Sequence, residues 1–475
     1  MSFIAYDLSL LVLFIILISI FLYVKRENLG KEGPLVLYRT KWGVKLIDKI
    51  GKKYKKTLDV LSYFCILLGY LLMASMIYLI SYSLYIYLTT PIVSVIRAPP
   101  VAPLIPYFPK LFGMSSIFPP FYFIYFLISI LIVATMHEFA HGIFSRRYNV
   151  KIKSTGFAFF KYFPAVLGAF VEQDEKQMFR KNNHEQKAIL SAGVSANFLT
   201  AILFLFLLLG FFSLAFTPSG IRFDTYAYGF INISDISSVN GITLTSNNYS
   251  NILDSLDENG LNKIKTDKID YVATKDFLEK QKENKGIIVL YYDSPAINSN
   301  LTGAINEING VKIKNREDLS SELSKYHKGD KITIKTKSSN ESLEYNIILD
   351  GNPEDKASNS SWLGIGFFNQ KKSGIIGKLY DLFYFKDPNV SYEPKFGETS
   401  DFIYYLLWWI VIINFLVASF NMLPAPILDG GRFFYLTILG ITKSKKISKI
   451  MSSILSYLIL LVFALLMLKW IFSFF

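Results

Sequence analysis

An apolar run from Phe121 to Phe144 carries a His-Glu-x-x-His motif near its end, at residues 137–141. A run of this length crosses a bilayer as a helix, because a helix satisfies its own backbone hydrogen bonds where no water is present. Positions i and i+4 of a helix share one face, so His137 and His141 can both bind one zinc ion while Glu138 lies beside its bound water. The motif therefore predicts a metallohydrolase centre inside a membrane.

A buried histidine is more often a satisfied core residue than a metal ligand, and this alternative has to be weighed first. The chain has only four histidines, and its composition would produce the motif by chance on the order of once in several hundred chains. Two imidazoles and a carboxylate in lipid are also costly, and ionisable groups at that depth generally have a function. These points favour metal binding.

Composition indicates a polytopic membrane protein rather than a soluble enzyme. Hydrophobic residues make up 52% of the 475 positions and gather in long runs. The net charge of +13 does not indicate nucleic-acid binding, because the lysines and arginines cluster beside these runs, where they act as topological anchors. We therefore expect no nucleic-acid partner. The single cysteine, Cys65, has no partner in the chain, so no internal disulfide is expected.

Hydropathy predicts about six membrane-spanning helices. The predicted spans are residues 3–24, 60–89, 121–144, 188–216, 401–441 with a break at 421–432, and 450–475. Eleven basic residues against three acidic ones between Lys25 and Lys56 mark a cytoplasmic loop by the positive-inside rule. We therefore predict a multi-pass protein of the cell membrane with its N terminus outside. The metal site would lie roughly 10 Å below the cytoplasmic surface.

Two features beside the metal-site helix are expected to matter for the site. Residues 156–160 and 166–171 have the pattern of two short strands. They form either a hairpin that dips into a cavity beside the metal or a plain cytoplasmic hairpin. The span 188–216 opens with small residues from Gly193 to Asn197, which are typical of close helix packing. Asn197 is a polar amide in lipid, and we expect it to face the site.

The composition changes at Thr217, where polar residues begin to dominate until about Ser400. We interpret this segment as a soluble α+β insert, which the parity of the spans places outside the cytoplasm. An amphipathic helix at 375–385 is predicted to lie on the membrane. The predicted domains are 1–120 (first spans and loops), 121–216 (first half of the membrane core), 217–400 (the insert) and 401–475 (second half of the core and last span).

The second half of the insert resembles a PDZ domain of the bacterial protease type. The pattern predicts a strand at 287–292, a helix start at 294–296, an Asn309-Gly310 turn, a helix at 316–326 and a strand at 331–336. Residues 241–286 contain either a long insertion or a second, degenerate copy. Thr302-Gly303-Ala304 stands where such domains have Gly-Asp, which speaks against the capture of peptide C termini.

Catalytic zinc generally takes three protein ligands and leaves the fourth position to water, so a carboxylate is needed from elsewhere. Asp429 is the leading candidate, because prolines and glycines beside it allow the backbone to bend at membrane depth. The alternative role of Asp429 is a helix N-cap. An unpaired aspartate in lipid is costly, which favours coordination.

Taken together, the motifs resemble those of the site-2 protease family of intramembrane zinc metalloproteases. That family pairs His-Glu-x-x-His on one membrane helix with Asn-x-x-Pro-x-Pro-x-Leu-Asp-Gly on a later one, and residues 137–141 and 421–430 match both in order. The resemblance implies that His137, His141 and Asp429 bind Zn²⁺ and that Glu138 is the catalytic base. It covers residues 121–216 and 401–440, and the PDZ-like insert between these halves is also similar to the family.

The sequence thus predicts a zinc-dependent endopeptidase that cleaves in or near transmembrane segments of membrane-protein or peptide substrates within lipid. Prior trimming of the substrate by another protease is expected, while the oligomeric state stays open. A transmembrane substrate has to unwind before cleavage, and we expect Asn421, Asn197 and the edge of the 156–171 hairpin to bind the opened strand.

Two alternatives are retained. A prenyl-protein endoprotease of the CAAX type also carries His-Glu-x-x-His in membrane helices, but it normally takes its third ligand from a later glutamate. A scaffold without activity would not need to keep Glu138 together with all the predicted ligands.

Overall fold

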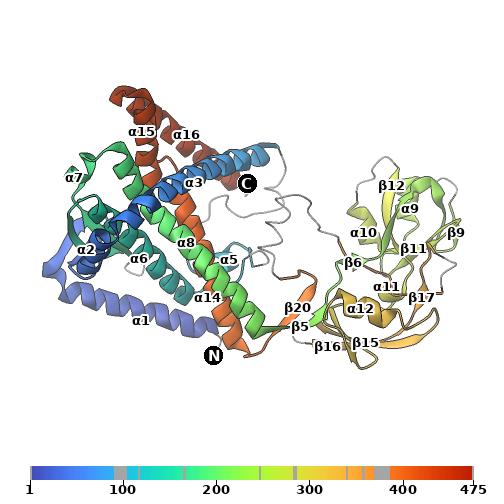
Figure 1. Ribbon diagram of the computed structural model, residues 1–475. Helices are drawn as coiled ribbons and strands as arrows, with labels where there is room; N and C mark the ends of the chain where they lie inside the picture. The colour runs from blue at the N-terminus through green and yellow to red at the C-terminus, as the bar shows by residue number, and fades with distance from the viewer. Residues whose placement is uncertain are drawn as a thin grey trace. The chain divides into compact units, whose positions relative to one another are not determined.

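A computed structural model describes the protein over residues 3–89, 104–115, 118–163, 167–244, 248–281, 286–338, 341–355, 359–368 and 386–472. The chain forms two compact units, and each is described by itself (Figure 1). The membrane unit comprises Met1–Phe212 and Glu398–Phe475, and the inserted unit comprises Ser213–Gly397. The predicted amphipathic helix at 375–385 lies outside the described residues, as do residues 90–103.

Six helices within the described residues are long and apolar enough to cross a membrane. They are α1 (Phe3–Val24), α3 (Lys55–Thr89), α6 (Phe123–Arg147), α8 (Asn183–Ala215), α14 (Glu398–Asn421) and α16 (Lys445–Phe472). They coincide with the predicted apolar runs and, with a β-rich segment between α8 and α14, they agree with a multi-pass membrane protein that carries an insert. α3 and α16 begin earlier than their runs, because a helix continues beyond lipid without apolar side chains.

The core of the membrane unit lies where α3, α8, α14 and the shorter helix α15 (Asp429–Thr442) meet. Gly69 of α3 permits this close packing, since a Cβ there would lie 3.2 to 3.3 Å from Met422, Ser191 and Phe433. Many large apolar side chains elsewhere on the six long helices are exposed. Such surfaces suit contact with lipid, because apolar side chains exposed to lipid tails do not carry the free-energy cost that exposure to water would bring.

A four-stranded antiparallel sheet adjoins α6. Its order is β1 (Leu29–Glu32), β2 (Leu35–Thr40), β3 (Ile152–Phe160) and β4 (Leu167–Gln173). The predicted hairpin is confirmed, since β3 pairs with β4 in a register that sets Gly156 against Phe170. β1 and β2 come from the basic loop after α1, where no strands were expected. Their addition leaves β4 as an edge strand on the side of α6.

The inserted unit contains two six-stranded sheets, each with its own apolar core. The first follows the order β7 (Tyr228–Asn232), β12 (Ile287–Tyr292), β11 (Asp270–Ala273), β10 (Asn262–Thr266), β8 (Ile236–Val239) and β9 (Ile242–Thr243). The second follows β16 (Glu341–Ile348), β15 (Lys331–Ser338), β13 (Ala304–Ile308), β5 (Phe216–Ile221) and β20 (Val390–Pro394), with β14 (Val311–Lys312) beside β13.

The two sheets repeat one sequence of elements. In each, a strand leads through an Asn-Gly turn to a short strand, a helix and two further strands; the helices are α9 (Tyr249–Asp254) and α12 (Arg316–Leu323). Both turns are left-handed, with φ of 49° and 81° at Asn240 and Gly241 and of 46° and 84° at Asn309 and Gly310. The described residues between 241 and 281 therefore belong to a second copy of this arrangement. β12 pairs with β7 and β11 in the first sheet, although the sequence grouped it with the second.

The carboxylate of Asp7, on α1, holds the start of α6. Its Oδ2 accepts hydrogen bonds from Tyr107 Oη at 2.5 Å and from the Phe123 backbone N–H at 2.7 Å, and its Oδ1 accepts one from Ile124 N–H at 3.0 Å. The first N–H groups of a helix have no acceptor within the helix, and a carboxylate there also lies at the positive end of the helix dipole. Asp7, which is 3% exposed, thus anchors the metal-site helix.

Replacing Asp7 with Ala should lower the free energy of unfolding of the membrane unit by about 1–3 kcal/mol, because buried N–H groups of α6 would lose their acceptor. Thermal unfolding in detergent measures this effect. Ser9→Ala on the same helix is the matched control, since the exposed Ser9 hydroxyl bonds only the Ala5 carbonyl. Equal melting temperatures for both variants would contradict the anchoring role.

Candidate metal centre

Three predicted ligands converge in the membrane unit. His137 and His141 lie one turn apart on α6, and Asp429 is the first residue of α15. The Nε2 atoms of the two histidines are 3.0 Å apart, and each lies 3.3 Å from Asp429 Oδ2. Among the described residues, no other group of three or more His, Cys, Asp and Glu side chains gathers this closely.

The triangle formed by these atoms fits a zinc ion. Ligand atoms at about 2.0–2.1 Å from a tetrahedral zinc lie about 3.3 Å from one another. The three sides of 3.0, 3.3 and 3.3 Å come close to this value. Two imidazole nitrogens and one carboxylate oxygen also make up a ligand set that catalytic zinc sites use.

The outer nitrogens of both imidazoles have partners on α8. His141 Nδ1 lies 2.7 Å from the Ile189 carbonyl, which can only accept, so Nδ1 carries the proton and Nε2 keeps its lone pair. His137 Nδ1 contacts the side-chain amide of Asn197 at 3.2 Å, and Asn197 Oδ1 has no hydrogen-bond partner. Metal binding at His137 Nε2 selects the amide orientation in which Oδ1 accepts from Nδ1–H, as is usual for metal-bound histidines.

Asn197 is thus buried against the ring of His137, whereas the sequence analysis expected it to bind substrate. Its side chain is fully buried, and the predicted contact with substrate stays a prediction. The position of this polar residue on an apolar helix predicted that it lies near the site, and in the structure its amide contacts His137. The sequence pattern could not predict whether the amide of Asn197 would face the cavity or the outer nitrogen of His137.

Glu138 lies between the ligand triangle and the sheet. Its Oε2 accepts a hydrogen bond of 2.9 Å from the backbone N–H of Val171, on β4. The same side chain lines a cavity of about 430 Å³ together with all three ligand residues. The carboxylate is therefore fixed at one oxygen and faces a space large enough for part of a polypeptide.

Both polar and apolar groups form the wall of this cavity. Asn421, at the end of α14, lies on the wall, and its predicted role in binding the substrate strand stays a prediction. Gln173 and Ile427 were not anticipated, because Gln173 lies beyond the predicted strand and Ile427 occupies an unspecified position of the 421–430 motif. Ile427 is 97% exposed. The remaining lining residues are apolar: Ile130, Val133, Ala134, Val171, Leu190 and Val417.

Glycines make the convergence possible. A Cβ at Gly193 of α8 would overlap His141 Nε2 and would lie 2.8 Å from His137 Cε1. A Cβ at Gly430 would overlap the backbone of Met422 and Leu423, which precede the turn to α15. Gly193 is therefore more than a small residue for helix packing, since its missing side chain leaves room for both imidazole rings.

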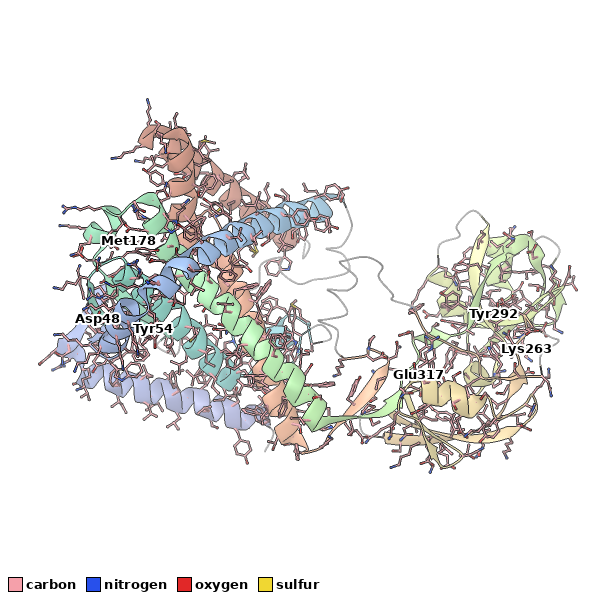
Figure 2. The ribbon with its side chains drawn as sticks, viewed as in Figure 1. Asp48, Tyr54, Met178, Lys263, Tyr292 and Glu317 are labelled. Atoms are coloured by element: carbon pink, nitrogen blue, oxygen red, sulfur yellow. The ribbon has the colours of Figure 1, made fainter. Side chains whose placement is uncertain are left out.

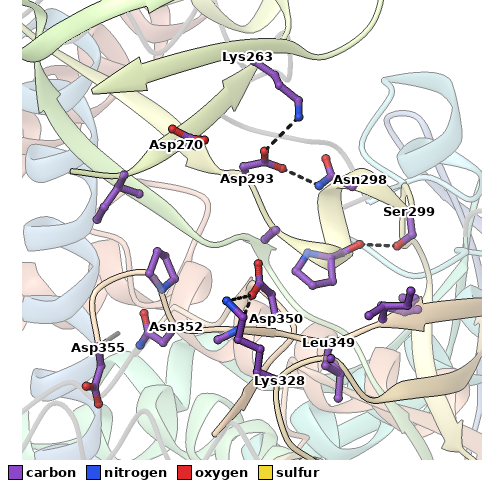
Figure 3. Close-up of a pocket in the computed structure, with 18 of the residues that line it drawn as sticks. Lys263, Asp270, Asp293, Asn298, Ser299, Lys328, Leu349, Asp350, Asn352 and Asp355 are labelled. Carbon is purple, nitrogen blue, oxygen red and sulfur yellow. Dashed lines mark hydrogen bonds and ion pairs between the residues drawn. The ribbon is translucent and has the colours of Figure 1, made fainter. Parts of the chain in front are cut away.

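A larger cleft, of about 1110 Å³, lies in the inserted unit between its two sheets (Figure 3). Two of its lysines form ion pairs with aspartates of the same cleft, Lys263 with Asp293 and Lys328 with Asp350. Lys328 Nζ donates to Asp350 at 2.8 Å, which lowers the pKa of that carboxyl below its usual value. Asn298 Nδ2 donates to Asp293 at 2.6 Å. The cleft is lined by neither histidine nor cysteine, so it offers no comparable zinc ligands.

Comparison with known proteins gives two matches. The sequence model of peptidase family M50 matches residues 125–466, which is more than half of the chain and includes every residue of the ligand triangle. A protein of Methanocaldococcus jannaschii, described as uncharacterized protein MJ0971, is 32% identical over 206 residues. That match covers 41% of this chain and 51% of the relative, so the chain spans about half the length of this curated relative.

Replacing Gly193 with Ala should abolish binding of a metal ion at this centre, because the added methyl group would displace both imidazole rings. Bound zinc is measured by mass spectrometry after purification and dialysis. Gly210→Ala on the same helix is the control, since a Cβ there would meet no atom within 4 Å. Full metal content in Gly193→Ala would show that the rings do not need this space.

Proposed function

Because the chain belongs to peptidase family M50, the site-2 protease family of membrane-embedded zinc metalloproteases, we propose that it is a zinc-dependent endopeptidase that cleaves other membrane proteins in or near their transmembrane segments. The observation that carries this proposal is the convergence of His137, His141 and Asp429 beside Glu138 in one cavity. Family membership also disfavours the prenyl-protein endoprotease alternative.

In this proposal His137, His141 and Asp429 hold the ion, which would lower the pKa of a bound water to about 7 and polarise the substrate carbonyl. The Ile189 carbonyl and Asn197 orient the two imidazoles by holding their Nδ1–H groups. Asp429 reaches the ion from the first turn of α15, where Gly430 permits the close approach of the preceding backbone.

Glu138 moves the proton. Since Oε2 is held by Val171 N–H, Oε1 is the oxygen that takes a proton from water and later returns it to the leaving amide nitrogen. The hydrogen bond from β4 keeps the carboxylate from turning toward solvent. A general acid–base of this kind typically contributes a factor of about 10²–10⁴ to the rate.

The substrate would bind as an extended strand along β4. A helical substrate hides its carbonyls in its own hydrogen bonds, so it has to unwind before one can reach the site. β4 is an edge strand whose Val171 N–H points toward the cavity, and by the period of a strand the backbone groups of Ala169 point the same way. Added-strand pairing at this edge, with Asn421 on the opposite wall, would hold the opened segment.

The inserted unit would act as a filter outside the cytoplasm. Its repeated order of strand, Asn-Gly turn, strand, helix and two strands supports two PDZ-like copies rather than one. The eleven basic residues between Lys25 and Lys56 support a cytoplasmic position for that loop and, by parity of the spans, an outer position for the insert. Bulky substrates would then be excluded until another protease trims them, as in regulated intramembrane proteolysis.

Replacing Glu138 with Gln should reduce cleavage of a model transmembrane substrate by at least about 100-fold while zinc content stays unchanged. Gln keeps the size of the side chain and can still accept from Val171 N–H, but it cannot accept a proton. The measurement is single-turnover cleavage in detergent or proteoliposomes. Equal cleavage by both proteins would leave a non-enzymatic scaffold as the better account.

Deleting residues 220–395 should widen the range of substrates that are cleaved, because the proposed filter would be lost while the metal centre remains. Cleavage of substrates with long and short outer domains is compared before and after the deletion. Zinc content controls for damage to the membrane unit. Loss of zinc from the shortened protein would refute the proposal that the insert filters substrates while the membrane unit alone holds the metal.

A further inference from the structure

Helix α2 (Val44–Lys53) carries a dense positive charge that the proposed proteolysis does not use. The segment from Lys41 to Lys56 contains seven lysines and one acid, Asp48. It connects α1, which ends at Val24, with α3, which begins at Lys55. It therefore lies where two long apolar helices reach the same membrane surface. Figure 2 labels Asp48 on α2 and Tyr54 immediately after it.

One face of α2 is fixed against the metal-site helix. Ile47 is fully buried and reaches Gly142 of α6, where a Cβ would lie 3.0 Å from its Cδ1. One turn later, a Cβ at Gly51 would lie 2.9 Å from the Ile143 carbonyl oxygen. Glycines on both helices thus permit close contact, which sets the rotation of α2 about its axis.

The only acid of this segment is neutralised within the same contact. Asp48 Oδ1 pairs with Arg146 Nε at 2.5 Å, and Arg146 stands in the last turn of α6. The pair also marks the depth of α2, because basic residues at the end of an apolar helix generally lie at the membrane surface. The charge that remains on α2 is positive only.

The opposite face of α2 presents lysines together with apolar side chains. With 100° per residue, Lys45, Lys49, Lys52 and Lys53 occupy one arc of the helix, all of them exposed. Leu46, 50% exposed, continues this arc, and Trp42, 75% exposed, precedes the helix. None of the four lysines forms an ion pair with an acid anywhere in the described part of the chain.

We propose that this exposed face of α2 is a binding site for anionic lipid headgroups, with Trp42 and Leu46 inserted beside them. A basic arc next to apolar and aromatic side chains is the pattern of helices that lie in the membrane interface. Each lysine close to an anionic surface strengthens attraction by about fivefold. The face is also preorganised, because its rotation is already fixed by the contact with α6.

The competing explanation is that the α2 lysines only set the orientation of the membrane helices, as basic residues of cytoplasmic loops generally do. A second lysine cluster distinguishes this explanation from specific lipid binding. Lys445, Lys446 and Lys449 at the start of α16 are equally exposed and equally close to an apolar helix. They serve as the matched control for Lys49, Lys52 and Lys53. Replacing either set with Gln removes the same charge, but only Lys49, Lys52 and Lys53 belong to the proposed site.

The test uses the full chain in detergent micelles with brominated lipids, which quench nearby tryptophan fluorescence. The signal of Trp42 is the difference between the wild type and Trp42→Phe. Brominated phosphatidylglycerol should quench it at a concentration at least tenfold lower than brominated phosphatidylcholine does. This preference should disappear in the Lys49→Gln, Lys52→Gln, Lys53→Gln variant and persist in the matched α16 variant.

Two results would overturn the proposal. Equal quenching of Trp42 by both lipids in the wild type would mean that the face does not select anionic headgroups, as expected if it instead binds a protein. Equal loss of preference in both lysine variants would mean that general charge near the membrane is responsible. Neither readout requires zinc or cleavage. A negative result for lipid binding therefore leaves the proposed protease activity untouched, and a negative result for cleavage leaves the lipid site untouched.

Discussion

The meeting of two imidazoles and one carboxylate around a single point is the constraint on which the membrane unit depends. Asp429 lies 288 residues beyond His141 in the chain, so the site exists only when α6 and α15 are packed together. Polar groups at this depth are costly unless they are paired. Gly193 and Gly430 let the neighbouring backbone approach without a clash, and the partners on α8 satisfy the outer ring nitrogens.

The helix that carries the motif is held at both of its ends. Asp7 of α1 binds the first N–H groups of α6, and α2 packs against its last turns. Between these anchors, β4 holds Glu138 through Val171 N–H. The base is therefore positioned by a strand while the ligands are positioned by helices. A substrate strand at the edge of β4 would approach both at once.

The sequence predicted those parts of the fold that depend on local hydropathy and on motif chemistry. The six long helices and the β3–β4 hairpin follow from runs and alternation. β2 was missed because its pairing with β3 is made over more than a hundred residues and leaves little local signal, and β1 was missed with it because β1 pairs with β2. β12 was grouped with the wrong sheet because the choice between neighbouring strands, here β7 and β11, is made by tertiary packing.

Within the site, the spacing of His137 and His141 and the depth of Asp429 predicted their neighbourhood, because charge in lipid requires a partner. The groups that contact the outer nitrogens of the two imidazoles were harder to predict. The Ile189 acceptor is a backbone carbonyl, which has no sequence signature, and the amide of Asn197 could equally have faced the cavity. The need for glycine at position 193 became visible only when the positions of both rings were known.

X-ray absorption spectroscopy of the zinc-loaded protein tests the central claim most directly, because it counts the ligands of the ion. We expect two imidazole nitrogens and further oxygen ligands at about 2.0–2.1 Å, with one fewer protein oxygen when Asp429 is replaced by Ala. A spectrum with one or three imidazoles, or one that Asp429→Ala leaves unchanged, would contradict a centre built from His137, His141 and Asp429.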